Sequence, residues 1–231
     1  MTDQISRSLG ILNLERGPRP PEPKLGALLN PHTFDFPIIS ETVKGAWADI
    51  VIRGDPALEP AYIAAARRLV DRGAVVITSN CGYSIRHQAA VAASVNVPVV
   101  MSSLLLAPTL LRQLPPVAKL AVVAAQSRHL GEDLLGIDDP AERARIVIGG
   151  IDGSKLLQNE NMRPPIPTET ADIESDVMAC VARMRDAHPE IAALLFECTA
   201  FPRVTAAIRL MTGLPVYDIT TLCRLTFASV T

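Results

Sequence analysis

The chain contains an internal repeat in which each copy of an apolar segment ends at a cysteine. The first copy reads AVVITSNC over 74–81, and the second reads AALLFEC over 192–198, followed by Thr199. In both copies a proline begins another apolar segment 17 residues after the cysteine, at Pro98 and at Pro215. The repeat predicts two similar halves that face each other, with the thiols of Cys81 and Cys198 on either side of one cleft.

The other apolar segments extend this pattern along the chain. Strands are predicted near 24–30, 50–54, 74–80, 97–101, 119–125, 145–149, 191–197 and 214–218. Helices are predicted over roughly 57–72, 84–95, 103–113, 128–135, 170–187, 202–212 and 220–229. The strand segments are continuously apolar, which is typical of parallel sheets covered by helices on both faces. The predicted fold class is α/β, with two three-layer α/β/α halves related by pseudo-two-fold symmetry and a cleft between them.

Proline content and spacing suggest the boundaries of these halves. Residues 18–23 are too rich in proline for a helix or a central strand, so residues 1–23 are predicted to form an N-terminal arm. The first half spans 24–114, and the second spans 115–218. The spacing from Ile146 to Cys198 is about 21 residues longer than the spacing from Ile50 to Cys81, and we assign the extra residues to a polar, proline-containing insertion at 153–169. Long loops of this kind often cover binding sites. The last helix, 219–231, is expected to pack back on the first half.

Composition excludes several classes of function. The net charge is −2 and the pI is near 6.1, so no electrostatic feature favours nucleic acid. No apolar run approaches the ~20 residues that cross a bilayer, and the first residues do not resemble a signal peptide. Four cysteines in 231 residues, none with zinc-ligand spacing, suggest neither a disulfide scaffold nor a metal site. We therefore expect a cytoplasmic protein with no metal, membrane or nucleic-acid partner.

Three short motifs resemble those of one enzyme superfamily. These are LNPHT over 29–33, NCGYS over 80–84 and ECTA over 197–200. Their order and spacing resemble the aspartate/glutamate racemase superfamily, which also includes hydantoin racemases, maleate isomerases and arylmalonate decarboxylases. The resemblance implies a cofactor-independent racemase or isomerase that acts on an amino acid, hydantoin or related small acid. A homo-oligomer is also expected.

The implied reaction is proton transfer at the carbon next to a carboxylate or amide. One thiol, of Cys81 or Cys198, removes the proton, and the other supplies one on the opposite face. Each cysteine precedes a predicted helix, whose N-terminus would lower the thiol pKa. Backbone N–H groups and hydroxyls near each cysteine are predicted to bind the substrate. The predicted substrate-binding residues are Asn30, Thr33, Asn80, Gly82, Tyr83, Ser84, Ser127, Thr199 and Ala200.

Purely structural roles and other reactions remain open from the sequence. A cysteine at the end of an apolar strand is usually part of a core, and Asn30 also suits a turn before Pro31. Ser127 suits a helix N-cap. Glu197, beside the second cysteine, has no evident role. Glutamate and aspartate racemases often have a histidine shortly after the second cysteine. No histidine follows Cys198 here, so the resemblance disfavours glutamate as the substrate. Alternative functions are cis–trans isomerisation of an unsaturated diacid by a nucleophilic cysteine, decarboxylation of a 2-substituted malonate, and metabolite binding without catalysis.

Overall fold

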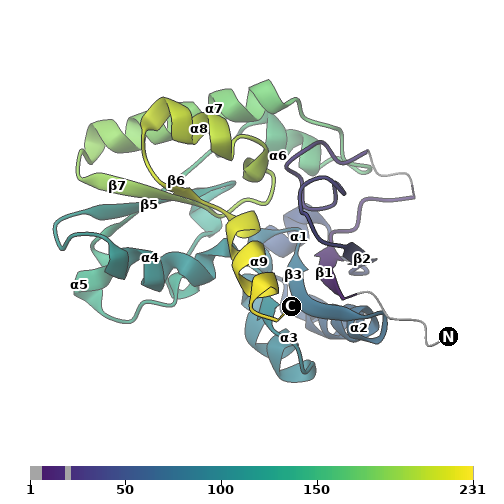
Figure 1. The fold of residues 1–231 in the computed structure, drawn as a ribbon. Helices are drawn as coiled ribbons and strands as arrows, with labels where there is room; N and C mark the ends of the chain where they lie inside the picture. The colour runs from purple at the N-terminus through teal and green to yellow at the C-terminus, as the bar shows by residue number, and fades with distance from the viewer. Residues whose placement is uncertain (1–6, 19–21, 231) are drawn as a thin grey trace.

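Each half of the chain forms a parallel four-stranded sheet, and the two sheets have the same strand order (Figure 1). The computed structural model describes residues 7–18 and 22–230. In spatial order, the first sheet consists of β2 (Ile38–Thr42), β1 (Ser8–Asn13), β3 (Ala74–Ser79) and β4 (Val99–Val100). The second consists of β6 (Ile146–Gly150), β5 (Lys119–Ala124), β7 (Ile191–Phe196) and β8 (Val216–Tyr217). The expected pair of α/β halves is therefore confirmed.

Helices cover both faces of the sheets. In Figure 1, α7 and α8 lie on one side of the second sheet and α4 on the other. The α-helices are α1 (Ala48–Arg53), α2 (Glu59–Asp71), α3 (Gln88–Ser94), α4 (Ala107–Gln113), α5 (Pro140–Arg143), α6 (Lys155–Glu160), α7 (Thr170–Ala187), α8 (Thr205–Thr212) and α9 (Ile219–Ala228). Short 3-10 helices are η1 (Pro56–Leu58), η2 (Gly82–His87), η3 (Ser103–Leu106), η4 (Ser127–His129), η5 (Glu132–Leu135) and η6 (Phe201–Arg203).

Strand β5 shows why the apolar runs indicated parallel sheets. Leu120 and Val122 belong to one buried cluster, and Ala121 and Val123 belong to another on the opposite face. Each of these four side chains is completely buried. A strand buried on both faces has no solvent-facing positions, so its sequence does not alternate between apolar and polar residues.

The first half differs from its prediction in three places. The predicted strand at 24–30 is a series of turns, and the predicted strand at 50–54 is part of helix α1. Strand β1, at 8–13, lies inside the predicted N-terminal arm, so the arm is wrong for these residues. Residues 1–6 and 19–21 of that arm lie outside the described residues.

Strand β1 was not predicted because Gly10 interrupts its apolar pattern. A Cβ atom on Gly10 would lie 2.8 Å from the Cβ of Ala74, so the close pairing of β1 with β3 requires glycine there. Strand β2 was not predicted either. It is a short edge strand, and its side chains are half-buried or exposed.

Two segments of the second half contact or cover the first. Helix α9 packs against β3 and β4, and its Leu222, Cys223 and Phe227 are buried. Helix α6 lies within the predicted insertion at 153–169, but it follows β6 as α1 follows β2, and its Leu156 and Leu157 are buried. No helix within the described part of the chain is long and apolar enough to cross a membrane.

Candidate active site

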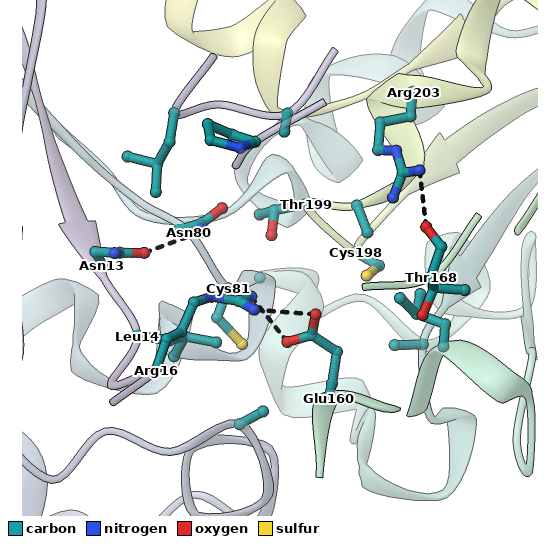
Figure 2. A pocket seen from close by; sticks show the side chains of 18 of the residues that line it. Asn13, Leu14, Arg16, Asn80, Cys81, Glu160, Thr168, Cys198, Thr199 and Arg203 are labelled. Carbon is teal, nitrogen blue, oxygen red and sulfur yellow. Dashed lines mark hydrogen bonds and ion pairs between the residues drawn. The ribbon is translucent and has the colours of Figure 1, made fainter. Parts of the chain in front are cut away.

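A cavity of about 670 Å³ is lined by residues of both halves. Cys81 lies two residues beyond the end of β3, and Cys198 lies two residues beyond the end of β7. Both cysteines line this cavity, and Figure 2 shows their side chains on two sides of it. The carboxyl ends of parallel strands meet at one edge of a sheet, and here the two edges face the same space.

The turn after β3 holds the Cys81 sulfur with two backbone donors. Cys81 has extended backbone angles and is the residue before the 3-10 helix η2. The backbone N–H groups of Tyr83 and Ser84 act on the thiol to lower its pKa, and the N–H of Ser84 donates to the carbonyl of Cys81 at 3.1 Å. The Ser84 hydroxyl is itself fixed by Tyr62, at 2.8 Å, and by Ser79, at 2.9 Å. These two hydrogen bonds fix the position of Ser84 within the turn.

Burial nevertheless raises the pKa of both thiols, contrary to the predicted lowering. The pKa of Cys81 rises to about 12, mainly because burial removes the solvation of a thiolate. Burial also raises the pKa of Cys198 well above its ordinary value, and only the N–H of Ala200 donates to that sulfur. The helices that follow are 3-10 helices of six and three residues, so their favourable effect is small compared with desolvation. Burial therefore favours the neutral thiol form of both cysteines.

Glu197 is a buried carboxyl group between the two turns. Its side chain is 1% exposed, and its Oε2 accepts a hydrogen bond of 3.2 Å from the N–H of Ala125. Burial raises its pKa to about 8, while this hydrogen bond and the charge of Arg86 act in the opposite direction. A Cβ atom at position 82 would lie 2.2 Å from the carbonyl oxygen of Glu197, so only Gly82 fits against it. Glu197, which had no evident role in the sequence, directly precedes Cys198 and lies against Gly82 in the Cys81 turn.

Two side chains of η2 reach across to the second half. The hydroxyl of Tyr83 donates to the carbonyl of Gln126 at 2.6 Å, and Arg86 donates to the carbonyl of His129 at 2.6 Å. Because η2 also supplies the donors to Cys81, its contacts with the second half help to fix the position of that thiol.

Several charged residues of the cavity were missed by sequence reasoning. Arg16, which follows β1, forms two hydrogen bonds of 3.1 and 2.8 Å to Glu160 at the end of α6 (Figure 2). Arg203 lines the same cavity and donates to the carbonyl of Thr168 at 3.0 Å. Arg16 and Glu160 are separated by 144 residues and belong to no repeat, so no local pattern connects them.

The predicted substrate-binding residues fall into two groups. Those that line the cavity are Asn80, Gly82, Tyr83, Thr199 and Ala200. Those outside its lining are Asn30, Thr33, Ser84 and Ser127.

The four residues outside the lining make hydrogen bonds within the protein. Asn30 donates to the carbonyl of Pro23 and accepts from the N–H of His32, as a turn residue does. Thr33 donates to the carbonyl of Ala27. Ser127 donates to Asp152, and Ser84 supports the Cys81 turn as described above. Among the residues described by the structure, no group of three or more His, Cys, Asp or Glu side chains is arranged to hold a metal ion.

Curated relatives of the chain are lyases. The chain is 31% identical over 222 residues to a dimethylsulfoniopropionate lyase of Durusdinium sp. clade D, covering 91% of this chain and 71% of that protein. It is 28% identical over 226 residues to dimethylsulfoniopropionate lyase 7 of Emiliania huxleyi, covering 94% of this chain and 65% of that protein. No protein-family model matches the chain.

Solved structures with the same fold come from the predicted superfamily. Glutamate racemase from Aquifex pyrophilus matches with a TM-score of 0.58 and 14% identity, over 97% of this chain and 84% of that chain. A glycine-to-cysteine mutant of arylmalonate decarboxylase, with sulfate associated, matches with a TM-score of 0.57 and 17% identity, over 96% of this chain and 92% of that chain. The aspartate/glutamate racemase fold is thus confirmed.

The activity predicted from the sequence is wrong. The sequence predicted a racemase or isomerase, whereas the curated relatives are lyases. The motifs around Cys81 and Cys198 identified the fold, but this fold occurs in both racemases and a decarboxylase.

Proposed function

The chain belongs to the family of the dimethylsulfoniopropionate lyases, and we propose that it cleaves dimethylsulfoniopropionate or a closely related sulfonium carboxylate by elimination. The observation that carries this proposal is the identity of 31% to such a lyase, over a chain whose two cysteines line one cavity. Its substrate, as the name describes it, has a carboxylate at one end and a dimethylsulfonium group at the other.

The chemistry needs a base next to a carboxylate. A thiolate removes a proton from the carbon beside the carboxylate, and the electron pair of that C–H bond forms a double bond to the next carbon. The bond from this carbon to sulfur breaks, and its electron pair leaves with neutral dimethyl sulfide. The products are acrylate, dimethyl sulfide and a thiol, which then returns its proton to solvent. No oxidant, reductant or cofactor takes part in these steps.

Cys81 is the better candidate for the base. Its sulfur accepts two backbone N–H hydrogen bonds, whereas that of Cys198 accepts one. Hydrogen bonds to the charged form favour a thiolate. Because burial raises the pKa of both thiols, the thiolate has to form when the substrate, with its positive charge, enters.

The carboxylate of the substrate is bound by the turns beside the cysteines. The side chains of Asn80 and Thr199 and the N–H group of Gly82 belong to residues that line the cavity. Donors of this kind stabilise the negative charge that develops on the carboxylate as the proton leaves. The hydrophobic part of the lining includes Ile38, Leu156 and Leu157, which suits the two methyl groups.

The test is incubation of the purified chain with dimethylsulfoniopropionate in D₂O. Gas chromatography measures dimethyl sulfide, and proton NMR measures acrylate. We expect both products in equal amounts, and no release from a protein in which both cysteines are replaced by serine. Absence of dimethyl sulfide under conditions where the wild-type protein is folded would overturn the proposal for this substrate.

A further inference from the structure

Glu160 is a partly buried carboxylate that lines the cavity, and it belongs to the second half. It is the last residue of α6, and its side chain is 23% exposed. Its partner Arg16, from the first half, is 19% exposed and holds both carboxylate oxygens. The pair therefore lies across the cavity rather than on the outer surface.

The charge of Glu160 is felt at both thiols. Burial is the main reason why the pKa of Cys81 and of Cys198 is raised, and the charge of Glu160 adds to this effect at both thiols. Figure 2 shows Glu160 beside Arg16, on the side of the cavity where the two sulfurs lie. The cavity lining contains two other acidic residues, but Glu22 is exposed, and burial raises the pKa of Glu197 to about 8.

We propose that Glu160 is the residue that recognises the cationic end of the substrate. It would select sulfonium carboxylates over carboxylates of the same shape that lack the positive charge. The assignment rests on the lyase function proposed above. A sulfonium group carries positive charge but has no N–H or O–H donor. It can therefore approach Glu160 without replacing the two hydrogen bonds that Arg16 donates.

The surroundings of Glu160 suit such a cation. Leu156 and Leu157, on the same helix, line the cavity together with Ile38 and Ile39 of strand β2. A carboxylate next to an apolar wall matches a charge that is surrounded by methyl groups. The bound cation also offsets the negative charge of Glu160 at the thiols, so substrate binding itself favours formation of the thiolate.

A second ion pair of the same insertion provides a matched control. Glu169 forms an ion pair of 2.6 Å with Lys24 of the first half, but its side chain is 68% exposed and it does not line the cavity. If Glu160 served only to hold the insertion in place, loss of either carboxylate would have a similar effect.

The experiment uses two unreactive ligands that differ in charge and hardly in shape. They are 3-(trimethylammonio)propionate, which is a zwitterion, and its carbon isostere 4,4-dimethylpentanoate. Isothermal titration calorimetry measures both on the full chain. We expect the wild-type protein to bind the zwitterion at least about tenfold more tightly, as one partly buried ion pair provides. Glu160→Gln should reduce this ratio to near one, while Glu160→Asp and Glu169→Gln should keep most of it.

The outcomes separate this proposal from the lyase function. If Glu160→Gln keeps the wild-type ratio, or if Glu169→Gln loses it equally, the assignment of Glu160 is wrong even when the wild-type protein releases dimethyl sulfide. A wild-type protein that binds both ligands equally, or neither, also overturns it. Failure to release dimethyl sulfide, with the charge preference intact and dependent on Glu160, contradicts the reaction but keeps the cation site. Circular dichroism of each variant verifies that it is folded.

Discussion

The turn after β3 and the turn after β7 occupy matching places in the two halves, but the surroundings of Cys81 and Cys198 differ. The residue before Cys81 is Asn80, whose amide donates to the side-chain oxygen of Asn13 at 3.0 Å. The residue before Cys198 is the buried Glu197, whose carboxyl accepts from Ala125. Two backbone donors serve the first sulfur and one serves the second. A repeated backbone therefore does not imply two equivalent thiols.

This inequality agrees with the proposed reaction. Inverting a carbon requires a base and an acid that exchange roles with direction, so the two groups need similar pKa values. Elimination requires a single base. The repeat in the sequence suggested a symmetric reaction, whereas the differences between the matched residues favour a reaction in one direction.

The largest effect is expected from removing each thiol separately. Cys81→Ser should lower kcat for release of dimethyl sulfide by roughly 10²–10⁴-fold, because a serine hydroxyl is a far weaker acid than a thiol and the general base is lost. Cys198→Ser should cause a clearly smaller loss. Gas chromatography of the product measures both. Equal losses in the two variants would show that the thiols act as a pair, and a larger loss for Cys198→Ser would reverse the assignment.

The second effect is a difference between Glu197 and its counterpart Asn80 in how they influence the pH dependence of the free energy of unfolding. The pKa of Glu197 is raised from 4.5 to about 8 in the folded protein, so the folded state binds more protons than the unfolded state between these values. The contribution of Glu197 to the free energy of unfolding therefore falls as pH rises from about 4.5 to about 8. The full change is roughly 3–5 kcal/mol, at about 1.4 kcal/mol per pKa unit.

Urea denaturation across this pH range measures the effect of Glu197. The variant Glu197→Gln should lose this part of the pH dependence, because its amide does not titrate. Asn80→Ala, at the matching position, should keep the wild-type dependence. An identical pH profile for wild type and Glu197→Gln would contradict the raised pKa.

A third comparison concerns the residue after each cysteine. Gly82→Ala places a Cβ atom 2.2 Å from the carbonyl oxygen of Glu197, so the two turns have to move apart. We expect the free energy of unfolding to fall by roughly 1–3 kcal/mol. Thr199→Ala, at the equivalent position, should cost less than about 1 kcal/mol. Thermal and urea denaturation provide the values, and equal costs would show that the close contact relaxes freely.

The smallest effect is expected at the bridge between the halves. Tyr83→Phe removes the hydroxyl that donates to Gln126 at 2.6 Å but keeps the buried ring. The free energy of unfolding should fall by about 1–2 kcal/mol, since the carbonyl loses a buried partner. Activity should fall as well, because this contact helps to position η2 and its donors to Cys81. A variant with unchanged stability and activity would show that the bridge is dispensable.

The second half could be predicted from the sequence more completely than the first. The four strands predicted near 119–125, 145–149, 191–197 and 214–218 match β5, β6, β7 and β8, because each is a continuous apolar run. In the first half, β1 is interrupted by Gly10, while 24–30 is apolar enough to resemble a strand although it forms turns around the cavity. Apolar content alone does not distinguish a strand from a turn that lines a hydrophobic cavity.

The cysteines of the candidate site could be found from their spacing, but its charged residues could not. Arg16 and Glu160 meet only because strand β1 and helix α6 face the same cavity, which depends on the tertiary structure. Glu197 gave one signal, an acidic residue directly after an apolar run. Its meaning became clear only with the contact to Gly82 and the hydrogen bond from Ala125.

Helix α9 follows the second half in the sequence but packs against the first half, so the two halves are not structurally independent. Its Phe227 stacks on Phe36 at 3.9 Å, and its Arg224 donates to the carbonyl of Thr33 in the first half. A protein truncated before residue 219 would expose the face of β3 and β4 that α9 covers. The repeat is thus not a pair of autonomous modules. The first half is complete only when α9 has packed against it, so the assembly of the sheet that carries the Cys81 turn depends on a helix that follows the second half.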